Sequence, residues 1–189
     1  MRIDYANKRI MDALVAGYTV PRYTTIYDPD GKVALYIVGT NGFVAYALEP
    51  REVCFNLARC REDGPAFLPL LESETLCRID NMLEPTLDVR VAATPTRKMY
   101  VDNLPIITNT EPVLLARFKG YTWDTFINMD LLEAFDDAKY YQEKKNGPVA
   151  VVEDGRLVGY VMPTKCDDLT GHYTDSPRPE NPPFDDEEE

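Results

Sequence analysis

Two stretches of this sequence carry the same local pattern, and that repetition constrains the fold more than any other feature. Each stretch places an asparagine before a run in which apolar residues recur every three or four positions, the spacing of one helical face. Two apolar runs joined by Asn-Gly or Asp-Gly follow, which is a strong hairpin signal because type I′ turns need positive φ twice. The first stretch occupies residues 3–48 and the second residues 124–162. An internal duplication accounts for both stretches better than a coincidence of ordinary elements.

In the first stretch we expect a helix over residues 8–17. Asn7 suits its N-cap, because the side-chain oxygen can accept a hydrogen bond from a free helical N–H. Gly17 suits its C-terminal end, where glycine adopts positive φ at little cost. The face expected to be buried is formed by Ile10, Met11, Leu14 and Val15.

The second stretch aligns with the first without a gap. Residues 128–135 match residues 7–14, and the asparagine, the apolar pair, the acidic residue and the alanine all coincide. A helix over residues 129–141, capped by Asn128, is therefore expected. Trp123 is expected to pack at the entry to this second unit.

Hairpins over residues 35–48 and 149–162 complete the two units. Their turns fall at Asn41-Gly42 and Asp154-Gly155, and residue 35 aligns with residue 149 as residue 48 does with residue 162. We therefore predict an α+β fold of two strand–helix–hairpin (β-α-β-β) units related by duplication, with the helices on one face of an antiparallel sheet.

Composition and linker residues set the expected boundaries. The first unit, with additional strands, is expected over residues 1–92, the second over residues 97–166, and an acidic tail over residues 167–189. The additional elements expected are strands over 53–57, 86–92, 98–102 and 113–118, and a broken helix over 66–79.

The C-terminal segment has a composition of its own. From Asp167 onward it holds nine acidic residues and one basic residue, with four prolines and few aliphatic residues. Such a segment cannot bury enough apolar surface to offset its ordering entropy, so we expect it to be disordered in isolation. Phe184, Asp185 and Asp186 resemble the apolar anchor and carboxylates of acidic tails in single-stranded-DNA-binding proteins, which implies a protein-interaction segment. The alternative is a tail that only increases solubility.

The cysteine and histidine content predicts neither a metal site nor a cofactor. Cys54, Cys60, Cys77 and Cys166 form no C-x-x-C pair, and His172 is the only histidine. Cys54 and Cys77 have apolar neighbours and are expected to be buried, reduced thiols. His172 lies at the start of the tail and is expected to be solvated, which leaves no candidate base for nucleophilic catalysis. We therefore predict no catalytic, cofactor-binding or metal-binding residues.

The sequence also predicts a cytoplasmic protein that does not contact membranes. No run approaches the roughly 20 apolar residues of a membrane helix. The first residues lack the hydrophobic run and small-residue cleavage site of a secretory signal. The net charge is −12, most of it in the tail, so the remainder of the chain is only mildly acidic.

Three segments of the second stretch resemble the repeat of DNA sliding clamps. Residues 126–135 are similar to the strand-to-helix entry of the last clamp domain, and residues 146–151 and 160–163 to its closing strands. The chain as a whole is similar to small proteins of bacterial phages and mobile elements. These resemblances imply a clamp-like, non-enzymatic binding protein in DNA metabolism. Because a bacterial clamp subunit has three domains, a ring would require a homo-oligomer of this shorter chain.

Two sets of charged residues are the candidate contact sites. Clamp helices bring basic residues to DNA, because neutralising phosphates drives that binding. Lys8 and Arg9, together with Arg22 and Lys32 among the tyrosines of the first unit, are therefore the expected nucleic-acid contacts. In the second predicted helix, an exposed stripe is instead acidic and is expected to contact a protein; it consists of Asp130, Glu133, Asp136 and Asp137.

Three functions remain open on this sequence. The first is a clamp-like accessory protein of replication or recombination. The second is an acidic inhibitor or DNA mimic that blocks a nucleic-acid-binding host protein, as anti-CRISPR proteins do. The third is an enzyme without a readable motif. A DNA-binding protein should lose affinity steeply with salt, whereas an inhibitor should not bind DNA.

Overall fold

The structure is a computed structural model that describes residues 1–17, 20–64, 82–95, 98–101, 104–107 and 110–164. One α-helix, α1, spans Ile3–Ala16. Short 3-10 turns are η1 (Pro50–Glu52), η2 (Leu57–Arg59) and η5 (Met129–Leu131). The strands are β1 (Arg22–Tyr27), β2 (Val33–Gly39), β3 (Val44–Leu48), β4 (Met82–Pro95), β5 (Lys98–Val101), β6 (Leu104–Ile107), β7 (Thr110–Gly120), β8 (Thr125–Asn128), β9 (Lys139–Gln142), β10 (Val149–Glu153) and β11 (Arg156–Val161).

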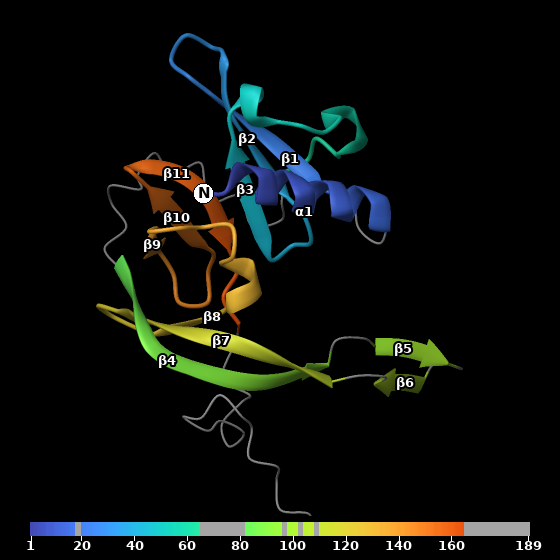
Figure 1. Ribbon diagram of the computed structural model, residues 1–189, viewed down its shortest axis with the longest axis vertical. Helices are drawn as coiled ribbons and strands as arrows, with labels where there is room; N and C mark the ends of the chain where they lie inside the picture. Colours follow the sequence, from blue (N-terminus) through green and yellow to red (C-terminus); the bar gives the residue numbers. More distant parts are fainter. Residues whose placement is uncertain (18–19, 65–81, 96–97, 102–103, 108–109, 165–189) are drawn as a thin grey trace, which may run out of the picture.

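Nine of these strands form a single antiparallel sheet in the order β1-β2-β3-β11-β10-β9-β4-β7-β8. The strands β4 and β7 form a long ribbon, and the small β5–β6 hairpin lies at its far end (Figure 1). The predicted α+β class is therefore wrong, because the described residues contain one α-helix and the fold is mostly β.

The second predicted helix is replaced by turns and a strand. After η5, the chain continues through further i→i+3 hydrogen bonds, in which Leu132 N–H donates to Met129 O and Phe135 N–H to Leu132 O. Asp137 then adopts a φ of 45° and redirects the chain into β9. The residues of β9 alternate between buried and more exposed positions and pair with β10, so strand pairing outweighs the helical spacing of the apolar residues.

The first helix forms, but it begins earlier than predicted. It starts at Ile3, and Asn7 is a buried residue of its interior rather than its N-cap. The Asn7 amide donates to Glu52 O (2.8 Å) and accepts from Cys54 N–H (2.9 Å), which fastens the helix to the segment around η1. The end at Gly17 is confirmed by its φ of 67°. Of the predicted apolar face, Ile10 is buried whereas Met11 and Val15 are exposed.

Both predicted hairpins are confirmed, but the register of their proposed duplication is wrong. The pairs β2–β3 and β10–β11 form, with φ of 49° and 77° at Asp154 and Gly155. At Asn41-Gly42 only Gly42 has a positive φ, of 80°, so the turn with two positive φ values that was predicted there is wrong. The two hairpins meet through β3 and β11, where Tyr46 lies opposite Gly159. The sequence alignment equates Tyr46 with Tyr160, the next residue, which points to the other face of the sheet. A one-residue slip exchanges the two faces, so the halves are not equivalent in that register.

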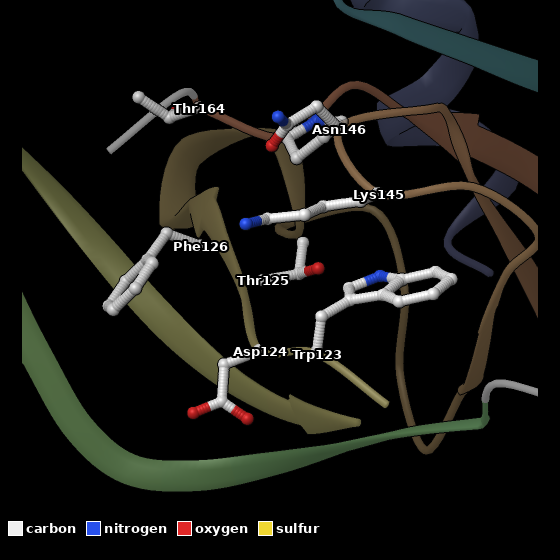
Figure 2. A pocket seen from close by; sticks show the side chains of 8 residues that line it. Trp123, Asp124, Thr125, Phe126, Lys145, Asn146 and Thr164 are labelled. Atoms are coloured by element: carbon white, nitrogen blue, oxygen red, sulfur yellow. The ribbon is translucent and has the colours of Figure 1, made fainter. Parts of the chain in front are cut away.

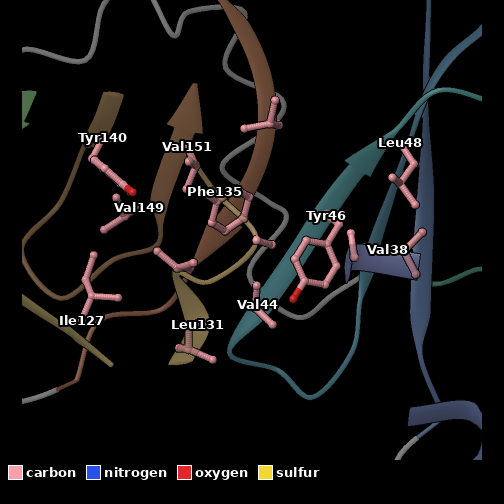
Figure 3. Close-up of a cluster of buried hydrophobic side chains, with 14 of the residues drawn as sticks. Val38, Val44, Tyr46, Leu48, Ile127, Leu131, Phe135, Tyr140, Val149 and Val151 are labelled. Atoms are coloured by element: carbon pink, nitrogen blue, oxygen red, sulfur yellow. The ribbon is translucent and has the colours of Figure 1, made fainter. Parts of the chain in front are cut away.

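The main core lies on the sheet face that α1 and η5 cover. Phe135, from the segment after η5, packs on Tyr46 with ring centroids 5.9 Å apart, and Phe118 packs on Tyr140 at 4.7 Å. Figure 3 shows Phe135 and Tyr46 among the valines of β3 and β10. Gly159 lies beneath the Phe135 ring, where a Cβ would approach the ring to 2.8 Å. Because Phe135 is anchored in the core, the segment from η5 to Phe135 lies against this face of the sheet.

The remaining predictions divide between confirmed and wrong. The strands predicted over 86–92, 98–102 and 113–118 correspond to β4, β5 and β7. The strand predicted over 53–57 is wrong, because those residues connect η1 to η2, and Cys54 is exposed rather than buried. Its N–H donates to Asn7 Oδ1 and its exposed thiol lies 3.7 Å from Glu52 O. The predictions for residues 66–79, Cys77, Cys166, His172 and the tail concern residues outside the described ranges.

In the part of the chain that the structure describes, no helix has the length and apolar character needed to cross a membrane.

Candidate functional site

The four acidic residues of the second predicted helix are all exposed, although no helix presents them. Asp130 lies in η5, where its N–H donates to Asn128 Oδ1 at 3.0 Å, so the predicted cap is present on a shorter turn. Glu133, Asp136 and Asp137 follow in the turns that lead into β9. They therefore lie along a folded-back segment instead of one helical stripe.

The end of β10 and the turn that follows it bring two more acidic residues next to these. The Asp136 N–H donates to Glu153 Oε1 at 2.9 Å, and the exposed Asp154 follows Glu153. We call the surface formed by Glu133, Asp136, Asp137, Glu153 and Asp154 the acidic turn surface. The sequence marked Asp154-Gly155 only as a hairpin turn, since its proximity to Asp136 depends on tertiary packing.

One carboxylate of the acidic turn surface is neutralised, because Glu153 is mostly buried and pairs with the N-terminal ammonium of Met1. Few positive charges offset the other four. Arg2 approaches Asp136 only to 3.9 Å, and both side chains are more than half exposed, so water and salt screen the pair. Arg2 and Arg9 lie over the ring of Tyr5, at 5.1 and 6.0 Å from its centroid. The Tyr5 hydroxyl donates to Glu133, and its pKa is raised by burial and then by that hydrogen bond.

The four predicted nucleic-acid contacts do not form one surface. Lys8 pairs with Asp12 at 3.0 Å along α1, and Arg22 pairs with Asp63 at 3.4 Å. Arg22 and Lys32 lie at opposite ends of the β1–β2 hairpin. The predicted tail contacts, Phe184, Asp185 and Asp186, lie outside the described residues.

A second candidate site, which the sequence did not indicate, is a pocket of about 340 Å³ at the start of β8. Its walls come from residues 123–126 at the start of β8, from residues 145–146 in the loop between β9 and β10, and from residues 163–164 after β11. The side chains named below are Trp123, Asp124, Thr125, Phe126, Lys145 and Asn146. In Figure 2 the Lys145 side chain reaches across the pocket, between Phe126 on one side and Trp123 on the other.

Gln142 fixes the position of this pocket from below. It is fully buried, and its Oε1 accepts from Trp123 Nε1 (2.7 Å) and from Thr125 Oγ1 (2.5 Å). Its Nε2 donates to Gly147 O at 2.8 Å, which anchors the β9–β10 loop. One amide thus holds both walls, and the Trp123 ring has a defined orientation.

The carboxylate at the pocket is paired with an arginine that it shares with a second carboxylate. Arg117 donates from Nε (3.0 Å) and Nη2 (2.5 Å) to Asp124 Oδ2, and from Nη1 to Asp88 at 3.1 Å. The hydrogen bond with Asp124 is the first cause of the raised pKa of Arg117, so its charge is fixed. Lys145 is exposed and forms no ion pair with any residue in the described ranges.

Within residues that the structure describes, no three His, Cys, Asp or Glu side chains lie close enough to hold a metal ion. The chain matches no family model, no curated protein and no solved structure.

Proposed function

We propose that this chain is a non-enzymatic binding protein that uses the acidic turn surface to hold a basic, nucleic-acid-binding protein. The observation that carries the proposal is the convergence of exposed carboxylates from two separate segments, Glu133, Asp136 and Asp137 from one and Asp154 from the other. Glu153, which links the two segments, is mostly buried and paired with the N-terminal ammonium of Met1. Such a surface complements a basic groove and steers its approach. It repels phosphates, so direct contact with DNA is not proposed for it.

The proposal favours the acidic inhibitor over the clamp-like accessory protein. The basic residues required for DNA contact are separated along α1 and the β1–β2 hairpin, and two of them are already paired. Four of the five acidic residues required for a protein contact are exposed, and Glu153 links the two segments that carry them. As part of the same proposal, the protein acts in DNA metabolism, in the cytoplasm of a cell that carries a phage or mobile element.

The test is a variant in which Glu133, Asp136 and Asp137 are all alanine. Because each exposed charge pair contributes about 0.2–1 kcal/mol, the variant should bind its protein partner about tenfold more weakly, and the association should depend less on salt. The replaced side chains are exposed, but Asp137 has a φ of 45°, which alanine adopts less readily than aspartate, so folding stability should fall by about 1–2 kcal/mol. The folded fraction of the variant is therefore measured before its affinity. The partner is first captured from a host lysate with the parent protein and identified, and its affinity is then measured with purified components.

The matched control replaces three exposed acids elsewhere, Asp12, Asp30 and Glu84, and changes the net charge by the same amount. Equal weakening by the two variants would show that only net charge matters and would contradict the proposal. A variant that keeps full affinity for the partner but gains affinity for DNA would instead favour the DNA-contact interpretation.

A further inference from the structure

The pocket at the start of β8 has a chemistry that the acidic turn surface does not use. We propose that it binds one nucleotide unit of single-stranded nucleic acid, with the base stacked on Trp123 and the phosphate paired with Lys145. The inference goes beyond the proposed function, because none of the pocket residues belongs to the acidic turn surface.

The Trp123 ring offers a face and not a hydrogen bond. Its only donor, Nε1–H, is already bonded to the buried Gln142, so the ring cannot turn that edge toward a ligand without breaking a bond. A ring held in place loses little conformational freedom on binding. Nucleobases stack on such rings with little dependence on sequence, because every base has a π-face.

The charge at the pocket is positive where the ligand would carry its phosphate. Asp124 would repel an anion strongly if it were free, but two hydrogen bonds from Arg117 weaken this repulsion, although Arg117 also pairs with Asp88. Lys145 reaches across the pocket beside Trp123 without an ion pair in the described ranges, and Lys144 precedes it. An aromatic face next to an unpaired ammonium is the combination that single-strand-binding grooves use.

The size of the pocket selects for a single nucleotide unit. A volume of about 340 Å³ lies at the small end of the range for small-molecule sites. A base within a duplex is stacked on both sides and would have to be extruded to enter. Asn146, on the rim, supplies an amide that can donate to and accept from the edge of the base. The ligand chemistry is thus a base with its phosphate, from a free nucleotide or from a single strand.

The chain contains one tryptophan and twelve tyrosines, so tryptophan emission, excited where tyrosine does not absorb, reports on this pocket. The probe is a deoxythymidine strand of about ten nucleotides, near the site size of single-strand-binding domains. We expect saturable quenching of Trp123 by this strand. Thymidine monophosphate distinguishes the source of the ligand: comparable affinity indicates a free nucleotide, and weaker affinity a strand. A duplex of the same length should not quench.

Variants separate stacking from charge. Lys145→Ala should weaken binding of the strand about fivefold and reduce the slope of log affinity against log salt by about 0.7, because one phosphate contact is lost. Trp123→Ala, followed by anisotropy of a labelled strand, should weaken binding about five- to hundredfold. Lys32→Ala, at the far β1–β2 turn, is the control and should change neither affinity nor slope.

Three results would overturn the inference. The first is an absence of quenching by the strand at low salt. The second is binding of the duplex as tight as that of the strand, which would leave charge as the only attraction. The third is an equal effect of Lys145→Ala and Lys32→Ala. Lys145 is exposed, so its variant should fold even if Trp123→Ala does not. None of these experiments measures partner binding, so its loss in the acidic triple variant would neither support nor overturn the inference.

Discussion

Gln142→Met removes the hydrogen bonds beneath the Trp123 pocket while nearly preserving side-chain volume. The change leaves three groups without their partner: Trp123 Nε1–H, Thr125 Oγ1–H and Gly147 O. Trp123 is only half-buried and can regain a water, whereas the Thr125 hydroxyl is buried. An unsatisfied buried group costs about 1–3 kcal/mol, so we expect the variant to lose about 3 kcal/mol of unfolding free energy.

Denaturant unfolding measures this loss, and a thermal melt should show a decrease in Tm of about 9 °C for a chain of this size. A double-mutant cycle with Thr125→Val sharpens the test. Because Val has no hydroxyl to satisfy, the double variant should be about 1 kcal/mol more stable than the sum of the two single changes predicts. The emission of Trp123 in the folded variant should also move to longer wavelength as its N–H becomes hydrated.

The reasoning is refuted by either of two results. If Gln142→Met costs less than about 1 kcal/mol, the amide does not hold the pocket together. If the effects of the two substitutions simply add, Gln142 and Thr125 are not coupled. A loss of stability without any change in Trp123 emission would show that Gln142 supports the sheet but not the orientation of the ring.

Two further changes test the packing of the sheet. Gly159→Ala should cost about 3 kcal/mol in denaturant unfolding, because the new Cβ would lie 2.5 Å from Ala45 O and 2.8 Å from the Phe135 ring; a change below about 0.5 kcal/mol would contradict this packing. Burial, with the nearby charge of Asp136, raises the pKa of Tyr140 to about 12, so the neutral hydroxyl stabilises the fold below pH 10 and this stability is lost as the pH rises from 10 toward 12. Tyr140→Phe lacks this ionisation, so its unfolding free energy should fall less steeply above pH 10, and at pH 12 it should have lost roughly 2 kcal/mol less than the parent. An equal decrease in the two proteins would show that the pKa of Tyr140 is not raised.

The features that the sequence predicted correctly are those set by neighbouring residues. Asp154-Gly155 turns the chain because both residues accept positive φ, and Gly17 ends α1 for the same reason. The Asn128 side chain caps a turn by accepting a hydrogen bond from the Asp130 N–H, two residues along the chain. Each of these features would form in many tertiary settings, so a local pattern was sufficient.

The features that the sequence missed depend on residues far apart in the chain. The apolar residues of 131–135 suit a helix, yet the outcome depends on β10, to which the following residues pair. Asn7 has the chemistry of a cap, but Glu52 and Cys54 provide its partners inside the fold. Trp123 was expected only to pack, because its bond to Gln142 spans 19 residues and leaves no local signal. For the same reason, no local pattern predicts that residues 133–137 and 153–154 lie side by side.

The two candidate sites lie at opposite ends of β10, which links their electrostatics. Val149, at one end, pairs with Gln142 beneath the pocket, and Glu153, at the other, belongs to the acidic turn surface. A five-residue strand separates them by about 14 Å. At physiological salt the Debye length is about 8 Å, so the carboxylates act only weakly on a phosphate at Lys145. At about 0.01 M salt it reaches about 30 Å, and the carboxylates then oppose a strand in the pocket. A basic partner seated on the acidic turn surface removes that opposition, so the two ligands should favour each other's binding most strongly at low salt.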